Sequence, residues 1–185
     1  MHPQLQAITD EYESAGVRLR RLLETVPAER WAERPAPERW SIAECVGHLN
    51  LTTEGFRPLV EAALAEGRRR GGPAPEHYRR DFVGWLMWRT AGPPARVRVK
   101  TTARFVSQST APARGLVTEF ERLQAEQLRW VAAADGLPLG SLQITSPFNA
   151  RLKYNLYSLL TILPRHEHRH LWQAEQAWQA LQQRS

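Results

Sequence analysis

Three histidines near opposite ends of the chain have the residue type and spacing of a metal site. His166 and His170 are four residues apart, so on an α-helix their imidazoles leave the same face, one turn apart. Both fall in the apolar stripe that should face the core, where an imidazole must find a partner. His48 lies in a separate segment that is also expected to be helical. Together the three side chains could form a facial site for a divalent metal.

A three-histidine site can do chemistry that a closed structural site cannot. Three protein ligands leave coordination positions open for water and substrate. A bound ion lowers the pKa of its water or of a bound thiol toward neutrality and so makes a nucleophile at physiological pH. Neutral imidazole suits zinc, nickel, copper and iron. The alternative is that all three are core histidines satisfied by ordinary hydrogen bonds.

Two neighbours of His48 are further candidates. Cys45 lies three residues before His48, so both could share a helix face, either as a fourth soft ligand or as a cysteine–histidine nucleophile pair. The alternative is a small buried cysteine that packs in the core. Glu44 lies four residues before His48 and could orient its imidazole or act as a base. It also completes a capping box with Ser41, which already accounts for its position.

Two neighbours of His170 complete the candidates. Gln173 follows one turn later and could hydrogen-bond a ligand, or it could lie on the surface. His168 is two residues after His166 and is therefore rotated by roughly 200° around the helix. We expect His168 to face solvent and to take no part in the site.

The apolar spacing predicts four long helices that would position these residues. Apolar residues recur at intervals of three and four over 5–26, a segment that ends at a proline. The capping box at Ser41 predicts a second helix from Ile42 to about Glu66. A third helix is expected over about 112–134 and a fourth over roughly 155–182.

The connection between the second and third helices, 67–113, is rich in proline and glycine. A structureless connection of this length would be unusual, so we expect a short helix over 82–88 and an extended arm over 96–106. Pro164 interrupts the fourth helix and predicts a kink just before His166. The kink is either a tolerated bend or a device that tilts His166 toward an ion.

Composition limits the class of protein. A chain of 185 residues with 42% hydrophobic residues can bury one sizeable core, and a single domain over 1–185 is expected. The net charge of +6 is spread over many arginines. The compact basic cluster Arg68–Arg70 is interpreted as a solvated loop. Because the chain lacks a helix-turn-helix or zinc-finger pattern, specific nucleic-acid binding is not expected.

Cellular location is also constrained. The single cysteine excludes an internal disulfide framework and fits a reducing compartment. The first residues show no secretory signal, and no stretch is apolar over membrane-spanning length. We therefore expect a cytoplasmic protein with no membrane partner.

At this point the sequence resembles a known family. The run from Pro27 to Leu49, which contains Trp31, Trp40 and the Ser41–Glu44 box, and the late run from His166 to Gln173 are similar to the DinB superfamily, also called the DinB/YfiT-like metalloenzymes. The resemblance spans nearly the whole chain. It implies an all-α four-helix bundle, often homodimeric.

The same resemblance implies a function. One histidine of the second helix and two of the fourth, here His48, His166 and His170, would bind a divalent metal such as zinc or nickel. Relatives in this family act as transferases or isomerases that use bacillithiol or mycothiol. We therefore expect an enzyme that activates water or a low-molecular-weight thiol for hydrolysis or thiol S-transfer on a small-molecule substrate. The alternative is a non-catalytic, metal-stabilised bundle that acts as a binding or interaction protein.

Overall fold

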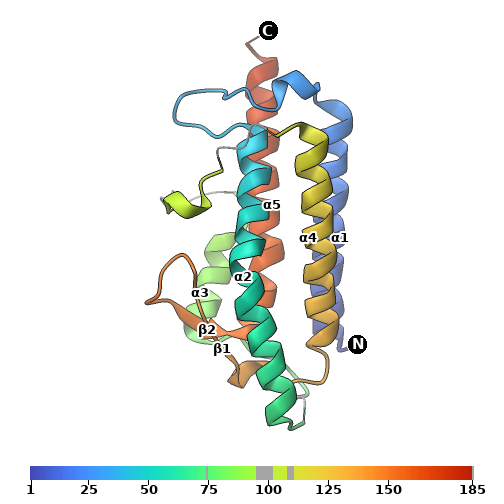
Figure 1. Ribbon diagram of the computed structural model, residues 1–185, viewed down its shortest axis with the longest axis vertical. Helices are drawn as coiled ribbons and strands as arrows, with labels where there is room; N and C mark the ends of the chain where they lie inside the picture. The colour runs from blue at the N-terminus through green and yellow to red at the C-terminus, as the bar shows by residue number, and fades with distance from the viewer. Residues whose placement is uncertain (74, 95–101, 108–110, 185) are drawn as a thin grey trace.

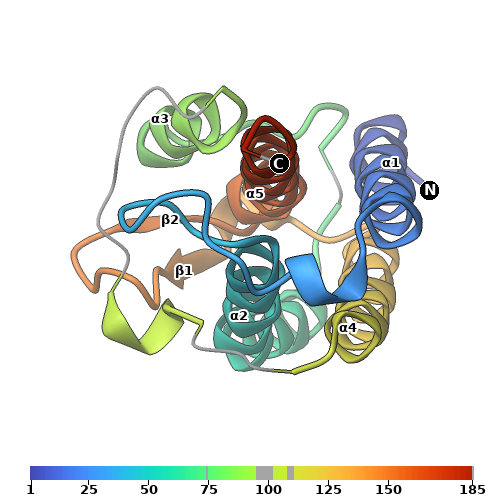
Figure 2. The ribbon, with the colours of Figure 1, turned by 90° about the horizontal axis from the view of Figure 1, so that it is seen from above.

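Four long helices form a bundle, as the apolar spacing predicted. The computed structural model describes residues 1–73, 75–94, 102–107 and 111–184. The bundle helices are α1 (Pro3–Thr25), α2 (Ile42–Arg70), α4 (Ala113–Ala133) and α5 (Leu156–Gln182). In Figure 1, α1 and α5 run upward while α2 and α4 run downward. Both α1 and α2 pack against α4 and α5 (Figure 2), so the helices that carry the histidines, α2 and α5, are antiparallel neighbours.

Side-chain caps fix where α2 and α5 begin. The Ser41 hydroxyl accepts a hydrogen bond from the Glu44 amide at 3.1 Å, and the Glu44 carboxylate accepts one from the Ser41 amide at 2.8 Å. This is the capping box expected from the sequence. At the start of α5, the Asn155 side chain accepts from the Ser158 amide at 2.8 Å. These caps define the first residue of each of the two helices.

The basic cluster Arg68–Arg70 was predicted to be a loop, and this prediction is wrong. The three arginines form the exposed last turn of α2. Arg69 and Arg70 both pair with Glu66 on the same helix. These pairs and the favourable position of cations at a helix C-terminus extend α2 beyond the predicted end.

A polar layer divides the core of the bundle into two hydrophobic clusters. One cluster contains Phe56, Trp130 and Leu163, and the other contains Leu49, Phe120 and Leu171. On α2, α4 and α5 the two clusters are separated by two to three turns. The buried polar residues Thr52, Thr53, Gln124, Gln127, Glu167 and His170 occupy these intervening turns, and His48 lies one turn before Thr52. The histidines therefore lie where this polar layer meets the cluster that contains Leu49 and Leu171.

The long connection contributes one short helix. α3 (Phe82–Ala91) packs along α5 at a close approach of Gly84, where a Cβ atom would lie 2.0 Å from the Ser158 hydroxyl. Helix α3 agrees with the prediction for 82–88. The arm predicted as extended over 96–106 lies partly in 95–101, outside the described residues. Its end forms the 3-10 turn η2 (Ala103–Phe105) instead of a strand.

The remaining elements are short. Two 3-10 turns, η1 (Ala28–Arg30) and η3 (Leu139–Ser141), and an antiparallel pair of strands, β1 (Gln143–Thr145) and β2 (Lys153–Asn155), complete the fold. The strands were not predicted. Helix α5 is continuous across Pro164. None of the helices in the described part of the chain combines the length and the apolar character needed to cross a membrane.

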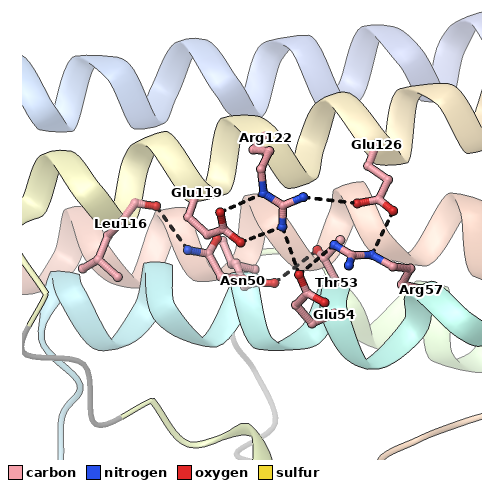
Figure 3. A network of polar contacts seen from close by, with 9 residues as sticks. Asn50, Thr53, Glu54, Arg57, Leu116, Glu119, Arg122 and Glu126 are labelled. Atoms are coloured by element: carbon pink, nitrogen blue, oxygen red, sulfur yellow. Dashed lines mark hydrogen bonds and ion pairs between the residues drawn. The ribbon is translucent and has the colours of Figure 1, made fainter.

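A network of charged side chains joins the parallel neighbours α2 and α4 (Figure 3). Arg57 pairs with Glu54 at 2.7 Å and with Glu126 at 2.8 Å, and Arg122 pairs with Glu54 at 3.0 Å and Glu119 at 2.7 Å. Beside them, the Asn50 amide donates to the Leu116 carbonyl at 3.1 Å. Single exposed ion pairs contribute little, but shared partners link them here. The network fixes α2 against α4 within two turns of His48.

Candidate metal centre

The three histidines converge on one point between α2 and α5. His166 Nε2 lies 3.3 Å from His48 Nε2 and 3.1 Å from His170 Nε2. One ligand atom from each residue lies within 4.8 Å of the other two. Two imidazole nitrogens that bind one tetrahedral zinc at 2.0–2.1 Å are about 3.3 Å apart. The spacing of the nitrogens therefore fits a single ion.

His48 is oriented by a backbone carbonyl of the long connection. Its Nδ1 atom lies 2.7 Å from the Phe105 carbonyl oxygen. A carbonyl only accepts hydrogen bonds, so Nδ1 carries the proton and Nε2 directs its lone pair into the cluster. A metal-binding histidine commonly has this arrangement. The Phe105 ring sits against Gly55, where a Cβ atom would approach it to 2.6 Å.

Glu44, which was predicted as a possible partner of His48, has other partners. Its carboxylate accepts hydrogen bonds from the Arg34 guanidinium, with Nε at 2.8 Å, and from the Ser41 amide. Burial alone would raise the pKa of Glu44, but these bonds outweigh it and the pKa is lowered. Glu44 is therefore an ionised helix cap and ion-pair partner. The hydrogen bond to Phe105, a contact that the sequence did not reveal, takes the orienting role.

Cys45 does not join the cluster. Its side chain is buried in the hydrophobic core with Val46 and Leu49. Burial raises the pKa of its thiol, followed in importance by the nearby charge of Glu44. A thiol in this environment is not the thiolate that binds metal or attacks a substrate. The packing alternative describes Cys45 correctly.

Gln173 and Trp40 lie beside His170. Gln173 is close enough to raise the pKa of His170, but the buried Nδ1 atom has no partner among the described residues that meets hydrogen-bond geometry. The Trp40 ring stacks on the His170 ring at 5.7 Å between centroids and lies 5.1 Å from the His48 ring. Trp40 thus fixes two of the three imidazoles. In the sequence, Trp40 belongs to the run that carries the family resemblance, which does not by itself reveal this role.

The environment keeps all three imidazoles neutral. Burial lowers the pKa of His48 and lowers the pKa values of His166 and His170 well below the ordinary range. Each of the last two is lowered further by neighbouring histidines and by Arg169. His48 and His170 are buried, whereas His166 retains some exposure. Neutral imidazoles have the free lone pairs that a metal requires.

Comparison with known protein families shows which family the chain belongs to. Residues 11–174 match the family model of the DinB superfamily. The chain belongs to the DinB superfamily. The matched range includes all three converging histidines, and this superfamily is a metal-binding family. No curated protein and no solved structure gives a significant match to the chain.

In this member of the DinB superfamily, aromatic rings surround the histidine cluster. Phe148, in the turn between β1 and β2, lies 6.3 Å from the His48 ring and 4.1 Å from the Phe105 ring. Together with Trp40, these rings form an apolar wall over the cluster. Phe105 and Phe148 come from loops, so the long connections build this wall rather than the bundle helices.

His168 and Glu167 point away from the cluster. His168 was predicted to face solvent, but it is half-buried: Arg18 donates to its Nδ1 at 2.8 Å and its Nε2 donates to the Glu11 carbonyl at 3.0 Å. Glu167 is buried and accepts a hydrogen bond from Gln124 at 3.0 Å. Burial raises the pKa of Glu167 to about 8. Both residues tie α5 to the other side of the bundle.

Proposed function

We propose that the protein is a divalent-metal-dependent enzyme that activates water or a small thiol for hydrolysis or S-transfer on a small molecule. The observation that carries the proposal is the convergence of three neutral imidazoles on one point. His48, His166 and His170 would hold the ion, and zinc or nickel suits this all-nitrogen set best. When bound, the ion would supply Lewis acidity and lower the pKa of a coordinated nucleophile.

Several residues orient the histidines and cover the cluster. The Phe105 carbonyl holds the tautomer of His48, and Trp40 restricts the rings of His48 and His170. Phe148 and Phe105 place apolar surface over the cluster, which limits water and strengthens electrostatic interactions there. Three protein ligands leave room for a nucleophile.

The environments of Cys45 and Glu44 favour a nucleophile from outside the protein. The chain has one cysteine, Cys45. It is buried, and its thiol has a raised pKa. Glu44, the nearest carboxylate along α2, is ionised but held by Arg34 and Ser41. These facts favour water or a small thiol such as bacillithiol or mycothiol over a covalent intermediate on the chain.

Metal content tests the site. Purified protein should contain about one divalent ion per chain, and His170→Ala should lose most of it, because each ligand removed weakens the chelate. His77→Ala is the matched control, since His77 is exposed and outside the cluster. Elemental analysis compares the three proteins. Equal metal content in His170→Ala and wild type would contradict the assignment.

Turnover tests the reaction. Metal-loaded protein is screened with bacillithiol, mycothiol or glutathione against small electrophiles, and separately with ester and amide substrates. We expect turnover by the metal-loaded protein and none by His48→Ala. Metal binding without turnover on any of these classes would instead support the non-catalytic, metal-stabilised bundle.

A further inference from the structure

A second polar site lies on the other side of α5, between α1 and α3. In Figure 2, α1 and α3 flank α5 away from α2. Here Arg80 and Arg165 both place their guanidinium carbon 4.2 Å from the centroid of the Trp88 ring. Arg80 Nε donates to the Thr161 hydroxyl at 2.9 Å, and Arg165 Nε donates to the Trp88 carbonyl at 3.2 Å. Both arginines are held in place through Nε, which leaves the terminal nitrogens for another partner.

The two guanidinium groups share one neighbouring carboxylate, Glu11, which forms an ion pair with neither. Within the described ranges of the chain, neither forms an ion pair with a carboxylate. Burial, the largest effect, raises the pKa of Glu11, and the positive charges of Arg165 and Arg80 oppose this rise. Burial also lowers the pKa of Arg80. Two guanidinium groups beside a single carboxylate leave a partly buried excess of positive charge, which is costly, and an anionic ligand would offset that cost.

A cavity of about 120 Å³ adjoins these groups. Its lining includes Gln4, Ile8 and the carboxylate-bearing Glu11 of α1, Trp88 of α3, Tyr157 and Thr161 of α5, and Arg80. At ~30 Å³ per water molecule, it has the volume of about four waters. The Tyr157 hydroxyl accepts a hydrogen bond from Gln4 at 2.9 Å. Its own proton has no acceptor among the described residues, so it is a second donor beside Arg80.

We propose that this cavity binds the carboxylate or phosphate group of a small molecule. The terminal nitrogens of Arg80 and the hydroxyl of Tyr157 would donate to the oxygens, because guanidinium groups match the geometry of both anions. Trp88 and Ile8 offer apolar surface for the body of the ligand. Arg165, behind Trp88, adds positive potential. This site is separate from the histidine cluster and does not depend on a metal.

Titration with inorganic phosphate and with benzoate tests the proposal. Binding is followed through the Trp88 indole N–H signal in ¹⁵N NMR spectra, assigned with Trp88→Phe, and by calorimetry. We expect a saturable shift of this signal with at least one anion. Stronger binding of phosphate would identify a phosphoryl ligand, and stronger binding of benzoate a carboxylate ligand. Both results support the proposal, and the absence of a saturable shift with either anion would overturn it.

Three variants locate the binding site. Arg80→Gln should weaken binding at least about tenfold, because a charge-assisted hydrogen bond is lost. Arg89→Gln removes the same charge from an exposed position of α3 and should leave the dissociation constant within about twofold, because exposed charges are screened. Glu11→Gln should tighten binding, since it removes the competing carboxylate and retains Arg80. Equal weakening by Arg80→Gln and Arg89→Gln, or no tightening by Glu11→Gln, would contradict the site.

Discussion

At the residue scale, His48 is oriented by a backbone group rather than by a side chain. The Phe105 carbonyl fixes its tautomer at 2.7 Å, whereas Glu44, the acidic neighbour on the same helix, is held by the α2 cap and Arg34. Any residue type supplies a carbonyl, so no sequence pattern marks position 105. The three histidines could be predicted because their side-chain chemistry and spacing are visible in the sequence. Their supporting contacts could not, because they depend on how distant segments meet.

The role of Glu44 predicts how stability depends on pH. Its pKa is lowered in the folded protein, so its stabilising effect is present above its unfolded pKa of about 4.3 and is lost as pH falls through the folded pKa. Glu44→Gln should lower the free energy of unfolding at pH 7 by about 1 kcal/mol. The difference between variant and wild type should shrink below pH 4. Urea unfolding of metal-free protein from pH 7 to pH 3 measures it.

Glu38→Gln is the control for this series, because Glu38 is exposed in the same loop region. It should leave stability nearly unchanged at every pH. A deficit of Glu44→Gln that stays constant down to pH 3 would show that its carboxylate charge does not stabilise the fold.

At the scale of elements, helices with a continuous apolar stripe were predicted to within a few residues. Helix α4 was expected over 112–134 and spans Ala113–Ala133, and α5 was expected over 155–182 and spans Leu156–Gln182. These helices each bury one face, which the spacing of apolar residues records directly. Helix α2 continues past its predicted end to Arg70. Its last turn is stabilised by ion pairs with Glu66 rather than by buried apolar residues, so apolar spacing did not predict it.

The short elements were missed for a physical reason. Strands β1 and β2 have three residues each and, in the described part of the chain, pair only with each other. Such strands are defined by their partner and by packing rather than by an intrinsic pattern. The turn η2 is likewise positioned by the Phe105 ring against α2. The loops that shape the candidate site therefore carry the weakest local signal in the sequence.

Because η2 lies close to α2, a methyl group added at Gly55 should change the metal affinity. Gly55→Ala would normally stabilise a helix by about 0.5–1 kcal/mol. Here the new Cβ atom would lie 2.6 Å from the Phe105 ring, so Phe105 must move and its carbonyl loses alignment with His48. We expect metal affinity to fall about tenfold, as it does when a hydrogen-bond partner of a ligand is removed. Competition with a chromogenic chelator measures the affinity.

Gly115→Ala is the matched control. Gly115 lies in α4, and a Cβ atom there would meet nothing within 4 Å. This variant should gain stability and keep the metal affinity of the wild type. Unchanged affinity in Gly55→Ala would mean that the position of Phe105 does not control His48.

At the scale of the whole molecule, the histidine cluster joins parts that are distant in the chain. His48 comes from α2, His166 and His170 come from α5, and Phe105 comes from the connection between α2 and α4. The cluster lies where the polar layer meets one of the two hydrophobic cores. An ion held there would link α2 directly to α5. His166 Nε2, which lies 3.3 Å from His48 Nε2 and 3.1 Å from His170 Nε2, would share the ion with both.

Metal binding should therefore stabilise the entire bundle. An ion at 100 times its dissociation constant stabilises the folded state by about 2.7 kcal/mol. In a chain of 185 residues, this free energy corresponds to a rise in Tm of roughly 5–10 °C. Calorimetry of chelator-treated protein, before and after addition of zinc or nickel, should show this rise. His170→Ala should show little response, and His77→Ala should respond like the wild type. A wild-type Tm that is the same with and without metal would show that the cluster does not hold an ion, because any ion bound only to the folded state must raise Tm.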